Sequence, residues 1–266
     1  MYDSFNRHIH YLRISVTDKC NLRCHYCMPA EGIPLIHHQD ILRLEEIFEV
    51  ARYGVEMGID KVRITGGEPL VRKGIVDLVA MLSTLKGIKD LSMTTNGILL
   101  SQYAHALASA GLQRVNISLD SVDPERYREI TRLGRLESVF EGIQAARQAG
   151  LWPIKLNCVV RHDSSEEDAT GVRAFAESNG LEVRFIRQMD LLAGTFSVVE
   201  NGEGGHCEAC SRLRLTSDGW LKPCLFNDLG YSIRAHGIPE AYALAIANKP
   251  ACGTHNHHGS FFRIGG

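Results

Sequence analysis

The chain alternates between short apolar stretches and longer segments of mixed polarity. Six stretches rich in Val, Ile and Leu predict buried strands, at residues 11–16, 61–65, 90–94, 114–119, 154–160 and 182–186. Between them the apolar positions follow helical spacing and predict helices over 41–57, 73–85, 101–110, 136–149 and 165–178. A glycine follows each helical segment, where a left-handed residue commonly ends a helix, namely Gly58, Gly87, Gly111, Gly150 and Gly180.

Strands that alternate with helices predict an α/β fold in which a parallel sheet is covered by helices. The predicted units are fewer than the eight of a closed barrel, so we expect an open, partial barrel. A doubly wound open sheet would produce the same alternation, and the pattern alone leaves it as an alternative.

The alternation stops after Met189, and the chain becomes rich in Gly, Asn, Cys and His. We therefore divide it into a barrel domain, residues 1–189, and a smaller C-terminal region, residues 190–266. This second region contains a predicted hairpin, 212–216 and 220–224, around the turn Ser217-Asp218-Gly219. A helix over 239–248 is expected next, and the final segment 255–266 is expected to be an irregular tail.

Composition places the chain among globular proteins. Of its 266 residues 44% are hydrophobic and 23% are charged, which excludes a disordered or collagen-like chain. The net charge of -2 excludes the strongly basic surface that non-specific nucleic-acid binding needs, so we expect no nucleic-acid partner. Membrane-spanning runs of roughly 20 apolar residues and a signal peptide are also missing from the pattern. We therefore expect a cytoplasmic protein with no membrane partner, whose eight cysteines stay reduced.

Three of these cysteines stand in Cys20-Asn-Leu-Arg-Cys24-His-Tyr-Cys27, directly after the first predicted strand. In a parallel barrel or sheet this loop opens at the carboxyl edge, where active sites are built. Three thiolates at C-x3-C-x2-C spacing can bind three irons of a 4Fe-4S cluster and leave the fourth iron open to a small molecule. Structural zinc takes four ligands, and His25 is an awkward fourth.

A second segment, Thr65-Gly66-Gly67-Glu68-Pro69, follows the second predicted strand. Its two glycines would let backbone groups approach a ligand closely, and the Glu68 carboxylate would bind a cationic amino group. Taken alone, the segment is equally compatible with an ordinary turn from a strand to a helix.

The cysteine spacing, with Tyr26 before the last cysteine, resembles the signature of the radical S-adenosylmethionine (SAM) superfamily. The Gly-Gly-Glu-Pro segment is similar to the superfamily motif that binds the methionine amino group. This resemblance implies a 4Fe-4S cluster on Cys20, Cys24 and Cys27, with SAM bound to the open iron. It also implies that an electron delivered there cleaves SAM and gives a 5′-deoxyadenosyl radical.

A second cysteine triplet lies in the C-terminal region. Cys207 and Cys210 are separated by two residues, and Cys224 follows after thirteen more. A second cluster with an open iron fits this set, and so does a zinc site completed by His206 or Cys252. Arg212 and Arg214 follow at a spacing that puts both on one face of a strand. Guanidinium groups beside a metal site suit an anionic substrate, although a solvated arginine pair is the simpler alternative.

The second triplet, its arginines and the terminal Ile264-Gly265-Gly266 resemble the GTP 3′,8-cyclase family, also known as molybdenum cofactor biosynthesis protein A. The similarity runs from Tyr11-Leu-Arg-Ile-Ser through Asn116-Ile-Ser-Leu-Asp120 to the last glycine. It implies a partial (βα)6 barrel of the TIM type with a small C-terminal cluster-binding region. The implied reaction converts GTP to 3′,8-cyclo-7,8-dihydro-GTP through H3′ abstraction, the first step of molybdenum cofactor biosynthesis. The implied partners are GTP, an electron donor and a second copy of the chain in a homodimer.

The same resemblance assigns the site residues. GTP would bind Arg13, Arg63, Thr94, Lys155, Arg212 and Arg214. SAM would lie against Tyr26, Gly66, Gly67, Glu68, Ser118 and Met189. A second 4Fe-4S cluster would be held by Cys207, Cys210 and Cys224, and the tail glycines Gly265 and Gly266 would assist catalysis together with Arg212 and Arg214.

Two features depart from the family pattern. Seventeen residues separate Met189 from Cys207, where family members carry a much longer segment. Arg187 also stands where the sixth-strand motif Phe-Ile-Glu has an acidic residue.

Two other functions are therefore kept. A related radical SAM enzyme with two clusters would act on a peptide or another nucleotide, but peptide-modifying relatives usually carry more C-terminal cysteines, and only Cys252 is spare here. A metal-binding scaffold would hold zinc or one unreactive cluster, but a scaffold does not need a SAM motif beside an open triplet.

Overall fold

The computed structural model describes residues 1–257 and 261–264. All six strands predicted for the first region are confirmed, with ends that differ by at most one residue. The strands are β1 (Tyr11–Ser15), β2 (Lys61–Thr65), β3 (Asp90–Thr95), β4 (Arg114–Ser118), β5 (Lys155–Val160), β6 (Glu182–Arg187), β7 (Arg212–Leu215), β8 (Trp220–Lys222) and β9 (Tyr231–Ser232).

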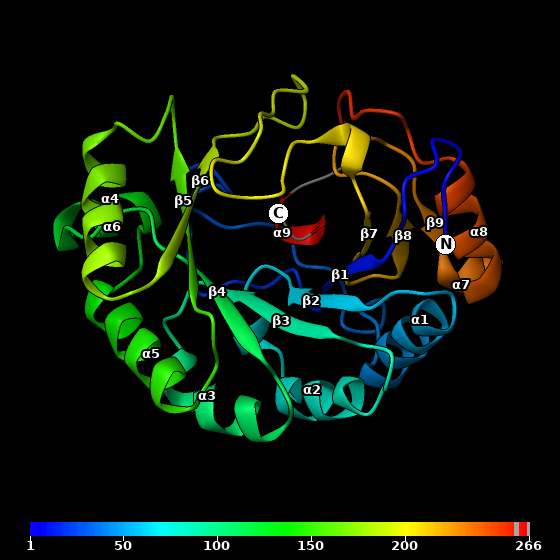
Figure 1. Ribbon diagram of the computed structural model, residues 1–266, viewed down its shortest axis with the longest axis horizontal. Coiled ribbons are helices and arrows are strands. Elements are labelled where there is room, and N and C mark those ends of the chain that lie inside the picture. Colours follow the sequence, from blue (N-terminus) through cyan, green and yellow to red (C-terminus); the bar gives the residue numbers. More distant parts are fainter. Residues whose placement is uncertain (258–260, 265–266) are drawn as a thin grey trace.

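The strands form one sheet in the order β6-β5-β4-β3-β2-β1-β7-β8-β9. From β1 to β6 each strand is parallel to the strand that follows it in the chain. A doubly wound sheet would reverse its strand order at a switch point, so that alternative is wrong. The sheet is curved and open, with β6 at one end and β9 at the other (Figure 1). The partial barrel is thus confirmed.

Helices cover the outer side of the curved sheet, where α1, α2, α3, α5 and α6 lie in an arc (Figure 1). The helices of the first region are α1 (Leu44–Glu56), η1 (Pro69–Val71), α2 (Ile75–Ser83), α3 (Leu100–Ser109), α4 (Pro124–Thr131), α5 (Leu136–Gln148) and α6 (Glu167–Ser178). The later helices are η2 (Cys207–Ala209), α7 (Ile233–His236), α8 (Ile238–Ala247) and α9 (Phe261–Ile264). The predicted helices are all found, whereas α4 was not predicted.

The glycines after the helices follow the prediction with one exception. Gly58, Gly111, Gly150 and Gly180 have positive φ, as expected for left-handed helix ends. Gly87 does not, because α2 already ends at Ser83 and its cap is Thr84. A side chain on Gly87 would instead meet the Val55 side chain at 2.4 Å, so this glycine allows close packing.

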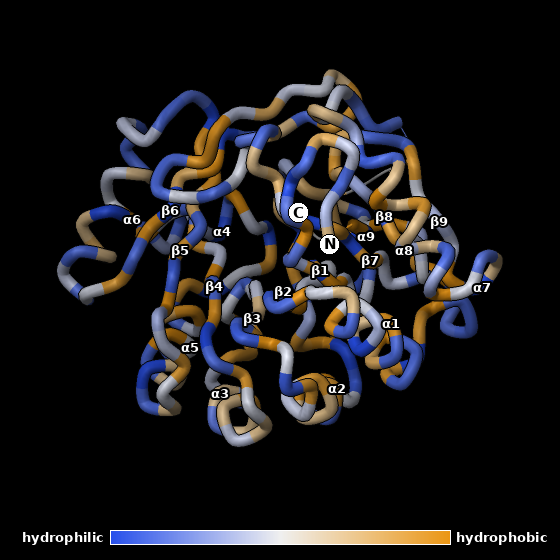
Figure 2. The backbone as a smooth tube through the Cα atoms, turned by 45° about the vertical axis from the view of Figure 1, so that its right-hand side comes forward, coloured by the Kyte–Doolittle hydropathy of each residue, from blue (hydrophilic) through white to orange (hydrophobic). Residues whose placement is uncertain are grey.

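Strand alternation divides the core from the interior of the barrel. On β1 and β2, Leu12, Ile14, Val62 and Ile64 are fully buried in the main hydrophobic cluster. Apolar residues are concentrated on the strands and on the helices around them, whereas many connecting segments are hydrophilic (Figure 2). The intervening positions, such as Tyr11, Arg13, Lys61 and Arg63, point into the interior and line a cavity there.

The C-terminal strands continue the same sheet. β7 is parallel to β1, and β8 and β9 follow in antiparallel pairing, which confirms the predicted hairpin. Gly219 in its turn has φ +90°, a conformation that favours glycine. The division of the chain at residue 189 stays a prediction.

The end of the described chain is not irregular, contrary to expectation. Phe261–Ile264 form α9, which lies in the opening of the barrel (Figure 1). Ile264 is buried against Leu191, Leu225 and Phe226 in a second small hydrophobic cluster. Within the described residues, we find no helix with the combination of length and apolarity that a membrane crossing needs.

Candidate active site

The interior of the barrel contains two adjoining cavities. The first cavity, of about 200 Å³, is lined by Cys20, Cys24 and Cys27, and the second, of about 190 Å³, by Cys207, Cys210 and Cys224. Three residues line both cavities, namely Asn157, Ile186 and Met189. The fold therefore brings the two cysteine triplets, nearly 200 residues apart in sequence, to neighbouring parts of one interior.

The Gly-Gly-Glu-Pro segment fastens the loop that carries the first triplet. The amide of Gly67 donates to the Thr17 carbonyl at 2.8 Å, and that of Glu68 donates to the Lys19 carbonyl at 2.8 Å. A side chain on Gly67 would lie 2.4 Å from the Lys19 carbonyl oxygen. The absence of a side chain thus also lets the protein's own backbone before Cys20 approach closely, and the expectation that these glycines admit a ligand stays a prediction. Both glycines also line the first cavity.

The Glu68 carboxylate is almost fully buried and is engaged within the protein. It accepts hydrogen bonds from the Leu70 amide at 3.1 Å, the Thr95 hydroxyl at 2.7 Å and the Asn96 amide at 2.7 Å. Burial raises the pKa of Glu68 to about 7, and these hydrogen bonds limit the rise. Glu68 thus joins the ends of β2 and β3 at the edge of the first cavity. Its predicted contact with an amino group stays a prediction.

Tyr26 is fixed by a neighbour that the sequence analysis did not assign to the site. Its hydroxyl donates to Asp120 at 2.6 Å, and the other Asp120 oxygen accepts from the Val159 amide at 2.8 Å. Burial raises the pKa of Asp120 to about 6. Asp120 directly follows the predicted strand that carries Ser118, a position at which parallel barrels place functional residues.

The remaining residues predicted for the SAM environment, Ser118 and Met189, also line the first cavity. Thr94 was predicted to contact the substrate, but the structure places it in this first cavity as well. Arg187, which replaces the acidic residue of the sixth-strand motif, lines the same cavity and is exposed.

The first-triplet cysteines are partly buried. Burial raises the pKa of Cys20 to about 11 and that of Cys27 to about 12, and raises the pKa of Cys24 as well. Without a metal these side chains are therefore thiols, and binding to iron or zinc would release their protons. The Leu22 amide donates to the Cys20 sulfur at 3.4 Å, which helps to orient it.

Within each cysteine triplet, at least one distance between sulfur atoms is larger than those between the ligand atoms of a site for one metal ion. Among the described residues, Asp228, His255 and His257 are the one group of three whose ligand atoms all lie within 4.8 Å of one another, and all three are exposed. Neither cysteine triplet is packed this closely. A tetrahedral zinc ion would draw its sulfurs to roughly 3.8 Å, given Zn–S bonds of about 2.3 Å. The wider arrangement suits a larger group such as an iron-sulfur cluster.

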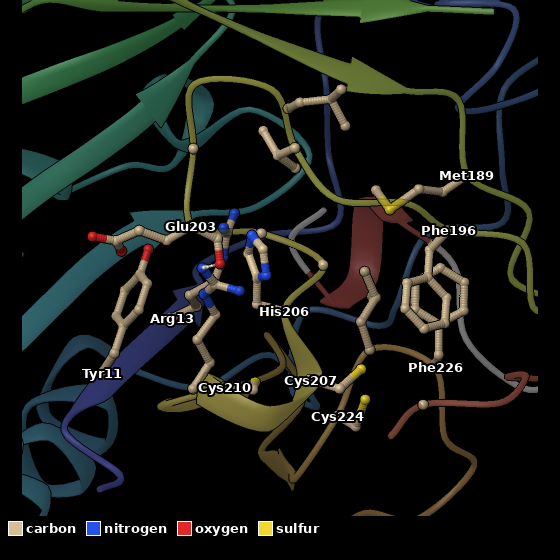
Figure 3. Close-up of a pocket in the computed structure, with 18 of the residues that line it drawn as sticks. Tyr11, Arg13, Met189, Phe196, Glu203, His206, Cys207, Cys210, Cys224 and Phe226 are labelled. Carbon is tan, nitrogen blue, oxygen red and sulfur yellow. Dashed lines mark hydrogen bonds between the residues drawn. The ribbon is translucent and has the colours of Figure 1, made fainter. Parts of the chain in front are cut away.

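The second cavity, part of which Figure 3 shows, is lined by several arginines and a lysine. The sequence predicted four of them, Arg13, Arg63, Arg212 and Arg214. The structure adds Lys61 and Arg184. Strand periodicity indicates both additions. Lys61 is two residues before Arg63 on β2 and so lies on the same face. Arg184 is next to the buried Phe185 on β6 and so points to the opposite face.

These cations surround Tyr11. Lys61 lies 4.9 Å, Arg63 5.4 Å and Arg212 5.6 Å from the centre of its ring. Burial would raise the pKa of Tyr11, but the surrounding cations lower it on balance. Burial and the neighbouring positive charges together lower the pKa of Arg13 to about 9. A cavity with this field favours a polyanionic ligand.

Lys155 is not part of this group. Its amino group forms an ion pair with Glu182 on the neighbouring strand, and it lines neither cavity. Asn157, two residues further along β5, lines both. The predicted substrate contact of Lys155 stays a prediction.

Two buried cations that the sequence analysis missed hold the second triplet in place. Arg7 donates to the carbonyls of Cys207 at 2.8 Å, Ala251 at 2.8 Å and Pro250 at 2.7 Å. Lys249 donates to the carbonyls of Arg212 at 2.8 Å and Pro223 at 2.6 Å. Nothing in the sequence near Arg7 or Lys249 indicates this role, since every partner is distant along the chain or belongs to a loop.

Positive charges lie close to sulfurs of the second triplet, and at Cys210 they reverse the direction of the pKa shift seen in the first triplet. Burial raises the pKa of Cys210, but the charges of Lys249 and Arg212 outweigh it, and the pKa is lowered. Burial raises the pKa of Cys207, which also has a hydrogen bond to Cys252. The spare cysteine of the sequence analysis thus lies beside the second triplet. Gly265 and Gly266 lie outside the described residues.

Comparisons with known proteins show the family of the chain. The profile of the Radical SAM superfamily matches residues 14–176. The chain is 43% identical over 298 residues to the GTP 3′,8-cyclase of Alkaliphilus oremlandii (strain OhILAs), which covers 94% of this chain and 93% of that protein. It is 39% identical over 324 residues to the GTP 3′,8-cyclase of Geobacter sulfurreducens (strain ATCC 51573 / DSM 12127 / PCA), which covers 100% of this chain and 99% of that protein.

A solved structure shows the same fold. SuiB from Streptococcus suis, bound to S-adenosylmethionine, superposes with a TM-score of 0.66 at 17% identity, over 88% of this chain and 65% of that chain. Both sequence alignments are longer than the 266 residues of this chain, so both relatives contain segments without a counterpart here. This agrees with the short connector between Met189 and Cys207.

Proposed function

Because the chain belongs to the GTP 3′,8-cyclase family of the radical SAM superfamily, we propose that it converts GTP to 3′,8-cyclo-7,8-dihydro-GTP, the first step of molybdenum cofactor biosynthesis. The single observation that carries this proposal is the pair of adjoining cavities, one lined by each cysteine triplet. One cavity can hold the radical source and the other the nucleotide, with Met189 and Asn157 where they meet.

Cys20, Cys24 and Cys27 would hold the first 4Fe-4S cluster, and SAM would bind in the first cavity. The donor set fits: three soft thiol ligands, partly buried and not preformed around one small ion. When bound and reduced, SAM supplies the 5′-deoxyadenosyl radical that abstracts hydrogen from the ribose C3′ of GTP. The protein contributes position: Tyr26 is fixed by Asp120, and Gly67 and Glu68 fasten the cysteine loop.

GTP would bind in the second cavity, its phosphates toward the cations of β1, β2, β6 and β7. Arginine and lysine donors suit phosphate oxygens, and a cluster of them at one end of the cavity gives the nucleotide a single orientation. The guanine would then lie toward Cys207, Cys210 and Cys224, and the ribose between the two cavities. This placement exposes C3′ to the first cavity, which is what the proposed hydrogen abstraction needs.

The second triplet would hold a second 4Fe-4S cluster with an open iron for the nucleotide. Lys249 supports this assignment, because its buried positive charge lies against Cys210 and favours thiolate there. Cys252 lies beside Cys207. The alternative to a cluster with an open iron is therefore a site in which four cysteines fill every ligand position.

The test compares Cys24→Ala with Cys207→Ala in anaerobically reconstituted protein. The parent should bind about eight irons, and each variant about four. With dithionite and SAM, Cys207→Ala should still form 5′-deoxyadenosine, whereas Cys24→Ala should form none. Equal iron content in parent and Cys207→Ala would contradict the second cluster, and deoxyadenosine from Cys24→Ala would contradict the first.

A further inference from the structure

The short connector between β6 and η2 places a carboxylate at the mouth of the cation-lined second cavity. Gly202, Glu203, Gly204 and Gly205 all line this cavity. The turn is held by its backbone: the Val199 amide donates to the Gly204 carbonyl at 2.9 Å, and the Gly202 amide to the Val199 carbonyl at 3.1 Å. Glu203 is the one residue of the four with a side chain, so the turn presents its carboxylate alone.

Glu203 interacts with the cations assigned to the phosphates. Its carboxylate lies 3.5 Å from the Lys61 amino group, and its carbonyl accepts from Arg212 at 2.9 Å. The charge of Lys61, with smaller contributions from Arg212 and Arg184, lowers the pKa of Glu203. Glu203 lies on the same side of the cavity as Tyr11 and Arg13 (Figure 3). The side chain is 75% exposed, so most of it is open to solvent.

We propose that Glu203 is a specificity-determining residue whose carboxylate competes with the phosphate groups of the nucleotide for Lys61 and its neighbouring cations. This inference rests on the proposed function, which places the phosphates in this cavity. A polyphosphate must displace the carboxylate or bind beside its negative charge, and either event weakens binding. A ligand without phosphate does not reach these cations and meets no such competition. Glu203 therefore limits the affinity of every phosphorylated ligand and leaves that of guanosine alone.

The experiment measures equilibrium binding by anaerobic dialysis to cluster-loaded parent and Glu203→Gln, with three probes: GTP, inorganic triphosphate and guanosine. Loss of one charge from an exposed ion pair should tighten GTP and triphosphate binding roughly two- to fivefold. Guanosine binding should not change. Thermal melting of both proteins checks that the substitution leaves the fold intact.

Glu200→Gln is the matched control, because Glu200 belongs to the same connector but pairs with Arg173 at 3.3 Å and does not line the cavity. It should bind all three probes as the parent does. Unchanged or weaker triphosphate binding in Glu203→Gln, or equal tightening in Glu200→Gln, would overturn the proposal. Tighter triphosphate binding together with no detectable GTP turnover would leave the role of Glu203 standing and count against the proposed reaction instead.

Discussion

Arg212 shows how a single side chain connects the two parts of the site. It stands on β7, two residues after Cys210, and its guanidinium lies over the Tyr11 ring in the second cavity. We expect Arg212→Ala to weaken GTP binding by about 1.5 to 3 kcal/mol, because it removes charged hydrogen bonds to the nucleotide. The dissociation constant of GTP measures this loss. Arg135→Ala is the control, because this exposed arginine lines neither cavity, and it should leave the dissociation constant unchanged. An unchanged constant in Arg212→Ala would remove Arg212 from the site.

Asp120 makes stability depend on pH. Its folded pKa of about 6 is above the ordinary value of 3.8, so the carboxyl favours the fold below about pH 4 and this contribution is lost as pH rises through about 6. Asp120→Asn stays neutral and keeps partners for Val159 and Tyr26. It should therefore gain up to about 3 kcal/mol relative to the parent at pH 8 but not at pH 4. Calorimetric melting at pH 4 and pH 8 measures the stability of the variant relative to the parent. An equal difference in stability at the two pH values would contradict the raised pKa of Asp120.

At the scale of residues, sequence reasoning found the groups that share a local spacing and missed those defined by the fold. The six cysteines of the two triplets and Arg212 and Arg214 stand in short motifs. Arg7 and Lys249 do not, because they act by donating to backbone carbonyls of other loops. Lys155 is a different case: the resemblance assigned it to the substrate, the structure pairs it with Glu182, and its substrate contact stays a prediction.

Among the elements, the β2 to η1 connection sets the geometry of the first triplet. A methyl group on Gly67 would lie 2.4 Å from the Lys19 carbonyl oxygen, so Gly67→Ala must push the cysteine loop away. We expect this variant to lose the iron of the first triplet, about half of the total, and to form no 5′-deoxyadenosine. Gly230→Ala is the control, since its methyl group would meet the Lys222 side chain at 3.4 Å and the Trp220 side chain at 3.6 Å, both ordinary contact distances. Full iron content in Gly67→Ala would show that the glycine is not needed for the loop.

The elements themselves were largely predictable, because each strand is a buried apolar run and each long helix has an apolar face. The missed helix α4 is short and polar, and its signal was local: Asp123 caps it by accepting from the Arg126 amide, and Pro124 follows. The path of the connector was not predictable. Its position over the second cavity depends on glycine-rich turns and on Arg212, not on any periodic pattern.

For the whole molecule, the sequence limited the topology to two choices, and the strand order decided between them. The alternation of strands with helices and the length of the chain predict parallel strands. They do not show whether the order of the strands reverses within the sheet. The curved sheet, with its helices outside, leaves one interior in which both cysteine triplets open. The homodimer and the electron donor stay predictions of the resemblance.

The most direct test of the account is the product formed from GTP. Reconstituted protein is incubated anaerobically with GTP, SAM and dithionite, and the nucleotides are separated and analysed by mass spectrometry. The account predicts a cyclised product with the mass of GTP but a different retention, formed together with 5′-deoxyadenosine. Formation of 5′-deoxyadenosine without any GTP isomer would contradict it, because the radical chemistry would then act on another substrate.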